Sequence, residues 1–165
     1  MSLPYVVYFA IFLAFPLVFA FVLIFHKWDI ITPMEYIGLD NFVRMFSDMK
    51  FFRALLNTII FLVIHIPLQI GIALLLAVFL NKKIMMRGFF RAIYFMPVVV
   101  SGVVITIVWQ QLYAYETGAI NLLLNKIGLP KLGWLTNPDL AMPSIAFMAT
   151  WKNVGLYIVL FLVGL

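Results

Sequence analysis

The chain has 165 residues, of which 66% are hydrophobic and only 10% are charged, and it has no cysteine. A water-soluble domain of this length has too small an interior to bury so much apolar surface, and the lack of cysteine excludes disulfides and thiolate metal sites. The formal charge of +5 is not spread over a surface for nucleic acid, because four of the eleven cations lie in the short segment 82–91 without any acid.

The first predicted element is a membrane-crossing helix near residues 4–26. Residues 4–25 contain no charged side chain, and about 20 apolar residues are enough to cross the hydrocarbon core of a bilayer. The stretch lacks the basic leader and the small-residue cleavage site of a secretory signal, so we expect it to be retained.

The next segment, 27–53, carries four cations and four acids and is predicted to face outward. Within it, residues 39–53 are predicted to form an amphipathic helix at the outer membrane surface, with Asp40 or Asn41 as its N-cap. The apolar positions recur at helical spacing and are Phe42, Met45, Phe46, Met49 and Phe52.

Three further spans are predicted near 55–80, 92–114 and 141–165, the last interrupted only by Lys152. The segment between the second and third spans contains Lys82, Lys83, Arg87 and Arg91. The positive-inside rule therefore places this segment, and both ends of the sequence, in the cytoplasm. The balanced segment 115–139 then faces outward; its apolar cluster 120–127 predicts a short helix that stops at Gly128.

Lys152 is the most informative candidate for a functional residue. At about 18 Å along the fourth helix it lies near the middle of the membrane, where a cation is costly unless it faces a wet pathway or a partner. Its neighbours Trp151 and Asn153, with Tyr157 one turn further, provide aromatic and amide groups that suit a sugar. The alternatives are a lysine that snorkels to the surface and a polar contact between helices.

Other polar or helix-bending residues favour structural roles. Pro16 and Pro97 are interpreted as ordinary kinks, whereas the mid-span Pro67 is left open. His65 and Gln69 lie four residues apart and are interpreted as interhelical contacts, and Trp109 as an interfacial belt residue. The predicted spans contain no Asp or Glu, which disfavours an ion-coupled carrier. No metal-ligand spacing, phosphate loop or nucleophile–base set indicates an enzyme or a resident cofactor.

Four segments in order resemble the permease subunits of sugar-type ABC importers, the maltose, glycerol-3-phosphate and lactose class. They are YIGLDNFVRMFSDMKFFRALLNTIIF at 36–61, LNKKIMMRGFFRAIYFMPVVVSGVVITIVWQQLY at 80–113, GAINLLLNKIGL at 118–129 and WLTNPDLAMPSIAFMATWKNVGLYIVLFLVGL at 134–165. The resemblance implies a second permease subunit, a cytoplasmic ATPase that uses the ATP, and an extracytoplasmic solute-binding protein.

The resemblance also implies that 1–165 is one incomplete permease domain, because the family's cytoplasmic coupling loop and last two helices would follow Leu165. It places the family's fourth-helix pattern on Trp151, Lys152, Asn153 and Gly155, and it makes Tyr157 a substitute for an aromatic position that is Leu156 here. We therefore expect an all-α, polytopic bundle of four spans and a surface helix in the inner or plasma membrane. Its expected function is carbohydrate import; a secondary carrier or channel and a non-transporting fragment are the alternatives.

Overall fold

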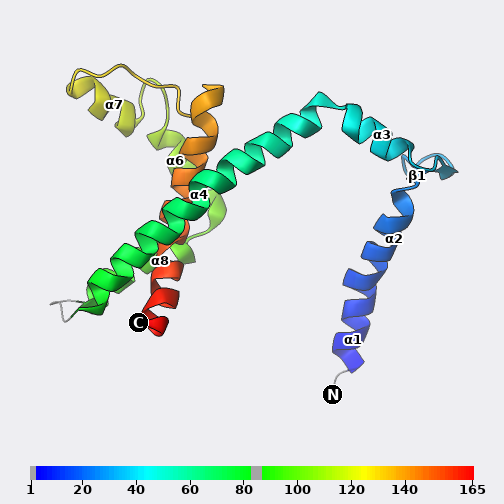
Figure 1. The fold of residues 1–165 in the computed structure, drawn as a ribbon, viewed down its shortest axis with the longest axis horizontal. Coiled ribbons are helices and arrows are strands. Elements are labelled where there is room, and N and C mark those ends of the chain that lie inside the picture. Colours follow the sequence, from blue (N-terminus) through cyan, green and yellow to red (C-terminus); the bar gives the residue numbers. More distant parts are fainter. Residues whose placement is uncertain (1–2, 83–86) are drawn as a thin grey trace. The chain divides into compact units, whose positions relative to one another are not determined.

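A computed structural model describes residues 3–82 and 87–165, which form two compact units, Met1–Leu55 and Leu56–Leu165. Helices dominate both units, and the described strands are one short antiparallel pair (Figure 1). Among the described residues, Leu3–Leu23, Met49–Asn81 and Pro138–Gly164 are long and apolar enough to cross a membrane, and a bent helix pair forms a fourth candidate span. The prediction of an all-α polytopic membrane protein is confirmed.

The first span is a helix with a π-helical turn in its middle. It consists of α1 (Leu3–Phe9), the π-helical turn η1 (Ala10–Ala14) and α2 (Phe15–Leu23). Pro16, at the start of α2, has no amide hydrogen to donate to the preceding turn. In η1 the amide of Phe15 bonds to the carbonyl of Ala10, five residues back, so the wider turn accommodates the proline.

The end of this span is closed by a side chain from the next helix. A two-residue pair, β1 (His26–Lys27) with β2 (Glu35–Tyr36), follows α2 and leads to α3 (Asp40–Ser47). Asn41 was predicted, with Asp40, as the N-cap of the surface helix, but the capping position belongs to Leu39. The Asn41 amide instead donates to the carbonyls of Ile24 at 2.9 Å and His26 at 3.0 Å, beyond the last turn of α2.

The predicted surface helix is shorter than expected. It ends at Ser47 rather than at residue 53, and α4 (Met49–Asn81) begins two residues later. Asp48 is extended between them, with φ −88° and ψ 112°, and its carboxylate accepts the amide of Lys50 at 2.8 Å. Asp48 therefore starts a new helix, since a carboxylate at this position satisfies an amide of the first turn.

The third predicted span is not one helix. The segment 92–114 is divided between α5 (Arg87–Val99) and α6 (Gly102–Leu112), whose axes differ in direction by 98°. We call the link at Val100–Ser101 the elbow. Pro97 removes a helical hydrogen bond just before it, and Ser101, with ψ 136°, adopts the extended N-cap conformation of α6. Within the preceding cationic segment 82–91, residues 83–86, which include Lys83, lie outside the described residues.

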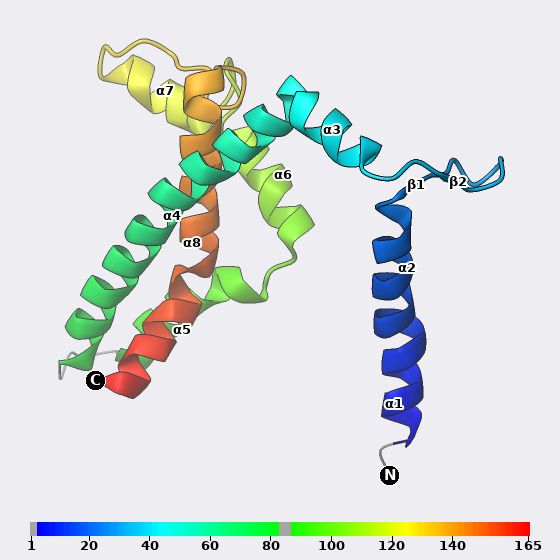
Figure 2. The same cartoon turned by 45° about the vertical axis from the view of Figure 1, so that its right-hand side comes forward.

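The second unit is completed by α7 (Ala119–Lys126) and α8 (Pro138–Gly164). In Figure 2, α8 runs between α4 and the bent α5–α6 pair. Ala73 and Ala77 of α4 are fully buried against Val154 and Ile158 of α8, and such small residues allow helices to approach closely. The short helix predicted at 120–127 is confirmed as α7, and Gly128 follows it with φ +80°.

Polar contacts also join these helices. His65 Nδ1 of α4 and Thr150 Oγ1 of α8 form a hydrogen bond of 2.9 Å. The interhelical interpretation therefore holds for His65. Gln69, four residues further along α4, is 3% exposed, and its side-chain amide has no hydrogen-bond partner among the described residues.

Candidate functional site

The helix α8 carries all four predicted site residues, and its packing decides where each of them lies. Thr150, Val154 and Ile158 are buried at spacings of four and form the stripe that faces α4. Gly155 faces α5 so closely that a Cβ atom on it would lie 2.0 Å from the carbonyl oxygen of Tyr94. The side chains around α8 are therefore fixed in direction by contacts on two sides.

Trp151 lies on the α6 side, in a group of aromatic rings. Its ring centroid is 5.6 Å from that of Trp109, which also contacts Phe147 at 5.8 Å and Tyr113 at 5.1 Å. Trp109 is only 7% exposed, so the interpretation of this residue as an interfacial belt tryptophan is wrong. The burial follows from the elbow, which turns α6 so that Trp109 packs against α8.

Lys152 points to the elbow. Its side chain is half-buried, and its Nζ atom lies 3.3 Å from the position that a Cβ would take on Gly102, the first residue of α6. Within the described parts of the chain, the ammonium group has no acidic partner and no hydrogen bond. Because this residue is a glycine, it places no side-chain atom of its own beside the ammonium.

Asn153 and Tyr157 lie on a different face. At 100° per residue, Asn153 is about 160° around α8 from Gly155, on the side turned away from α5. Asn153 is half-buried and Tyr157 is 38% exposed. On α8, Asn153 and Tyr157 therefore lie on one face, whereas Trp151 and Lys152 lie toward the α5–α6 pair. Of the latter two residues, Lys152 is closer to Asn153 around the helix axis.

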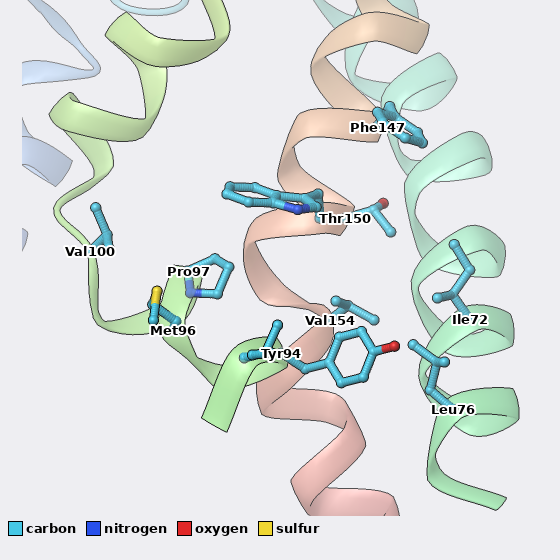
Figure 3. Close-up of a pocket in the computed structure, with 11 residues that line it drawn as sticks. Ile72, Leu76, Tyr94, Met96, Pro97, Val100, Phe147, Thr150 and Val154 are labelled. Carbon is cyan, nitrogen blue, oxygen red and sulfur yellow. The ribbon is translucent and has the colours of Figure 1, made fainter. Parts of the chain in front are cut away.

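A cavity of about 460 Å³ lies between α4, α5 and α8 (Figure 3). Tyr94 extends from α5 past Val154 toward Leu76, and Pro97 and Thr150 also line the space. Its lining is almost wholly apolar, and the Thr150 hydroxyl is already bonded to His65. Such a cavity matches an apolar side chain or acyl chain better than a solute rich in hydroxyl groups.

A second group of polar contacts lies in the segment between α6 and α8. Its centre is Asn121 of α7, which is fully buried. Its amide donates to the carbonyls of Tyr115 at 3.0 Å and Leu132 at 2.9 Å, and its oxygen accepts from the Leu132 amide and the Trp134 indole. All four hydrogen-bonding positions of the side chain are used, so this residue fastens the segment and has none left for a ligand.

Sequence reasoning missed the elbow, Gly102 and the contact at Gly155. Three consecutive valines, a serine and a glycine after Pro97 were the available signal for a helix break. No group of three or more His, Asp or Glu residues that could hold a metal ion occurs in the described residues.

Comparison with known proteins assigns the chain to a family. No family model matches it. A probable ABC transporter permease protein of Bacillus subtilis is 38% identical over 84% of this chain and 49% of its own length. The lactose transport system permease protein of Rhizobium radiobacter is 36% identical over 80% of this chain and 45% of its own length.

A solved structure agrees with these relatives. A chain of a bacterial alginate ABC transporter, crystallised with an alginate pentasaccharide-bound periplasmic protein, matches 99% of this chain and 54% of its own length, with a TM-score of 0.80 and 27% identity. The chain is therefore a member of the sugar-type ABC transporter permeases, and it spans about half the length of the curated relatives that it matches.

Proposed function

We propose that this multi-pass membrane chain forms part of the translocation pathway of an ABC importer for a carbohydrate. The observation that carries the proposal is the similarity of the sequence to permease proteins of lactose, arabinooligosaccharide and trehalose/maltose transport systems, together with the matching fold of the alginate transporter chain. Residues 1–165 act in this proposal as one transmembrane permease domain without a cofactor of its own.

The proposed partners follow from the same class of transporter. A second permease subunit forms the other side of the pathway, a cytoplasmic ATPase uses the ATP, and an extracytoplasmic solute-binding protein delivers the solute. The alginate transporter, whose structure was solved with a periplasmic protein, supports the last of these. The four predicted spans contain no acidic side chain, which favours an external energy source over coupling to an ion gradient.

The proposed orientation places residues 82–91, and residues 1 and 165, on the cytoplasmic side. Because the chain has no cysteine, single cysteines can report it directly. We expect Met86→Cys to resist a membrane-impermeant maleimide in intact cells and Asn125→Cys in α7 to react with it. Labelling of Met86→Cys from outside would show that the topology is inverted.

The proposed residues of the substrate pathway are Lys152, Asn153, Tyr157 and Trp151. Asn153 and Tyr157 share the face of α8 that is turned away from α5, and an amide next to an aromatic ring can bind a sugar by hydrogen bonding and stacking. Trp151 is held by the contact with Trp109, so its role is to support the adjacent residues.

Replacing Asn153 by leucine in the full-length transporter should lower carbohydrate uptake about tenfold or more, since a desolvated hydrogen bond to the solute is lost. Assembly with the ATPase, measured by copurification, should not change. Leu75→Asn, at an exposed position of α4, is the control for altered polarity. Unchanged uptake in Asn153→Leu and Tyr157→Ala would show that this face does not contact the solute.

A further inference from the structure

Lys152 carries the only formal charge in the four charge-poor stretches 4–25, 54–81, 92–115 and 140–165. Its side chain is half-buried against the elbow, 3.3 Å from the position of a Cβ on Gly102. A cation at this depth in a membrane helix is costly unless an opposite charge or water compensates it.

The described part of the chain does not supply that opposite charge. Its one ion pair joins Lys131 to Glu116, and the Lys152 ammonium makes no hydrogen bond there. The acidic residue of α8, Asp139, lies about 20 Å away along the helix. The first turn of α6 beside the ammonium carries a positive partial charge, which cannot neutralise a cation.

We propose that Lys152 is a specificity-determining residue that pairs with a carboxylate on the transported carbohydrate, so that the solute is a uronate-containing saccharide. This inference rests on the proposed function. A neutral sugar offers only hydroxyl oxygens and leaves the ammonium charge uncompensated, whereas a carboxylate accepts charge-assisted hydrogen bonds and neutralises it.

The surroundings of the ammonium suit this role. Gly102 places no side chain in front of Nζ, so a carboxylate can approach on the side of the elbow. Asn153, one residue along α8 and about 100° around it, offers an amide to the hydroxyl groups of the same sugar ring or the next. The two residues would therefore bind different groups of one solute, since Lys152 pairs with its carboxylate and Asn153 forms hydrogen bonds with its hydroxyl groups.

The test uses the full-length transporter with its ATPase and binding protein in proteoliposomes. The probes are digalacturonate, its dimethyl ester, which has the same backbone without the charge, and the neutral disaccharides lactose and maltose. We expect ATP-dependent uptake of digalacturonate to exceed that of the ester. Lys152→Met should lower the ratio of acid to ester uptake about tenfold or more, while Lys152→Arg should retain most of it.

Lys126→Met, at an exposed lysine of α7, is the matched control and should leave the ratio unchanged. A ratio that Lys152→Met does not alter, or loss of the assembled complex in that variant, would overturn the proposal; the latter would assign Lys152 to a structural ion pair with another part of the transporter. Uptake of neutral disaccharides alone by the unmodified transporter would also overturn it and leave the proposed function intact. Absence of ATP-dependent uptake of every probe would instead count against the proposed function itself.

Discussion

Replacing Gly155 by alanine should destabilise the protein by about 2 kcal/mol or more, although alanine is the better helix former by about 1 kcal/mol. The added Cβ would lie 2.0 Å from the Tyr94 carbonyl oxygen, 2.6 Å from its carbonyl carbon and 2.9 Å from the Phe95 Cα. All three are backbone atoms of α5, so no side-chain rotation can relieve the overlap. Helices α5 and α8 would have to separate, which would also open the cavity between them.

The measurement is the thermal midpoint of the detergent-solubilised full-length protein, with the yield of monodisperse material as a second readout. Gly71→Ala provides the matched control, because Gly71 also lies within a long helix but a Cβ there would meet no atom within 4 Å. We expect this variant to be neutral or slightly stabilised. A Gly155→Ala protein as stable as the unmodified one would show that α5 and α8 are not in this contact.

Replacing Asn121 by aspartate should loosen the segment 115–137 and destabilise it by about 2–4 kcal/mol at neutral pH. The substitution keeps the oxygen that accepts from Leu132 and Trp134 but puts a second oxygen opposite the carbonyls of Tyr115 and Leu132. Two hydrogen bonds are lost, and a carboxylate is left buried against carbonyl oxygens. The rate of limited proteolysis within the segment measures the loosening.

The pH dependence of this variant distinguishes lost hydrogen bonds from a mere packing defect. Burial against two carbonyls raises the pKa of the introduced carboxyl above its unfolded value, so its folded form binds a proton more readily. The deficit should therefore shrink as the pH falls through the raised pKa, where the protonated group donates one hydrogen bond again. Asn125 is exposed one turn away on α7, so the Asn125→Asp variant should be cleaved like the unmodified protein at neutral pH and at acidic pH.

The outline of the fold was predictable because hydropathy depends on composition alone. The charge-free stretches located the spans, and the apolar cluster before Gly128 located α7. Local propensity could not tell that Leu39 occupies the capping position of α3, since Asp40 and Asn41 are both good caps. The partners of Asn41, the carbonyls of Ile24 and His26, lie at least 15 residues away and are set by tertiary structure.

The candidate site was predictable in part for the same reason. Helical spacing places Asn153 and Tyr157 on one face, because both residues lie within the continuous helix α8. The position of Lys152 beside Gly102 depends on the 98° elbow and joins residues 50 apart in sequence, and the glycine itself carries no chemical sign of the contact. Likewise, a tryptophan near the end of a straight helix would lie at the interface, but the bend buries Trp109.

The elbow also changes how far α5 and α6 reach. Helices of about 20 and 17 Å joined at 98° extend only about 25 Å from end to end, whereas the hydrocarbon core of a bilayer is about 30 Å thick. The Ser101 carbonyl accepts the Ile105 amide at 3.1 Å, but any peptide group of the elbow without a helical hydrogen bond must be covered by protein or reached by water, because lipid tails offer it no partner. The bent α5–α6 pair alone is therefore shorter than the hydrocarbon core, and the elbow beside the Lys152 ammonium is a point within the crossing where non-helical backbone requires polar neighbours.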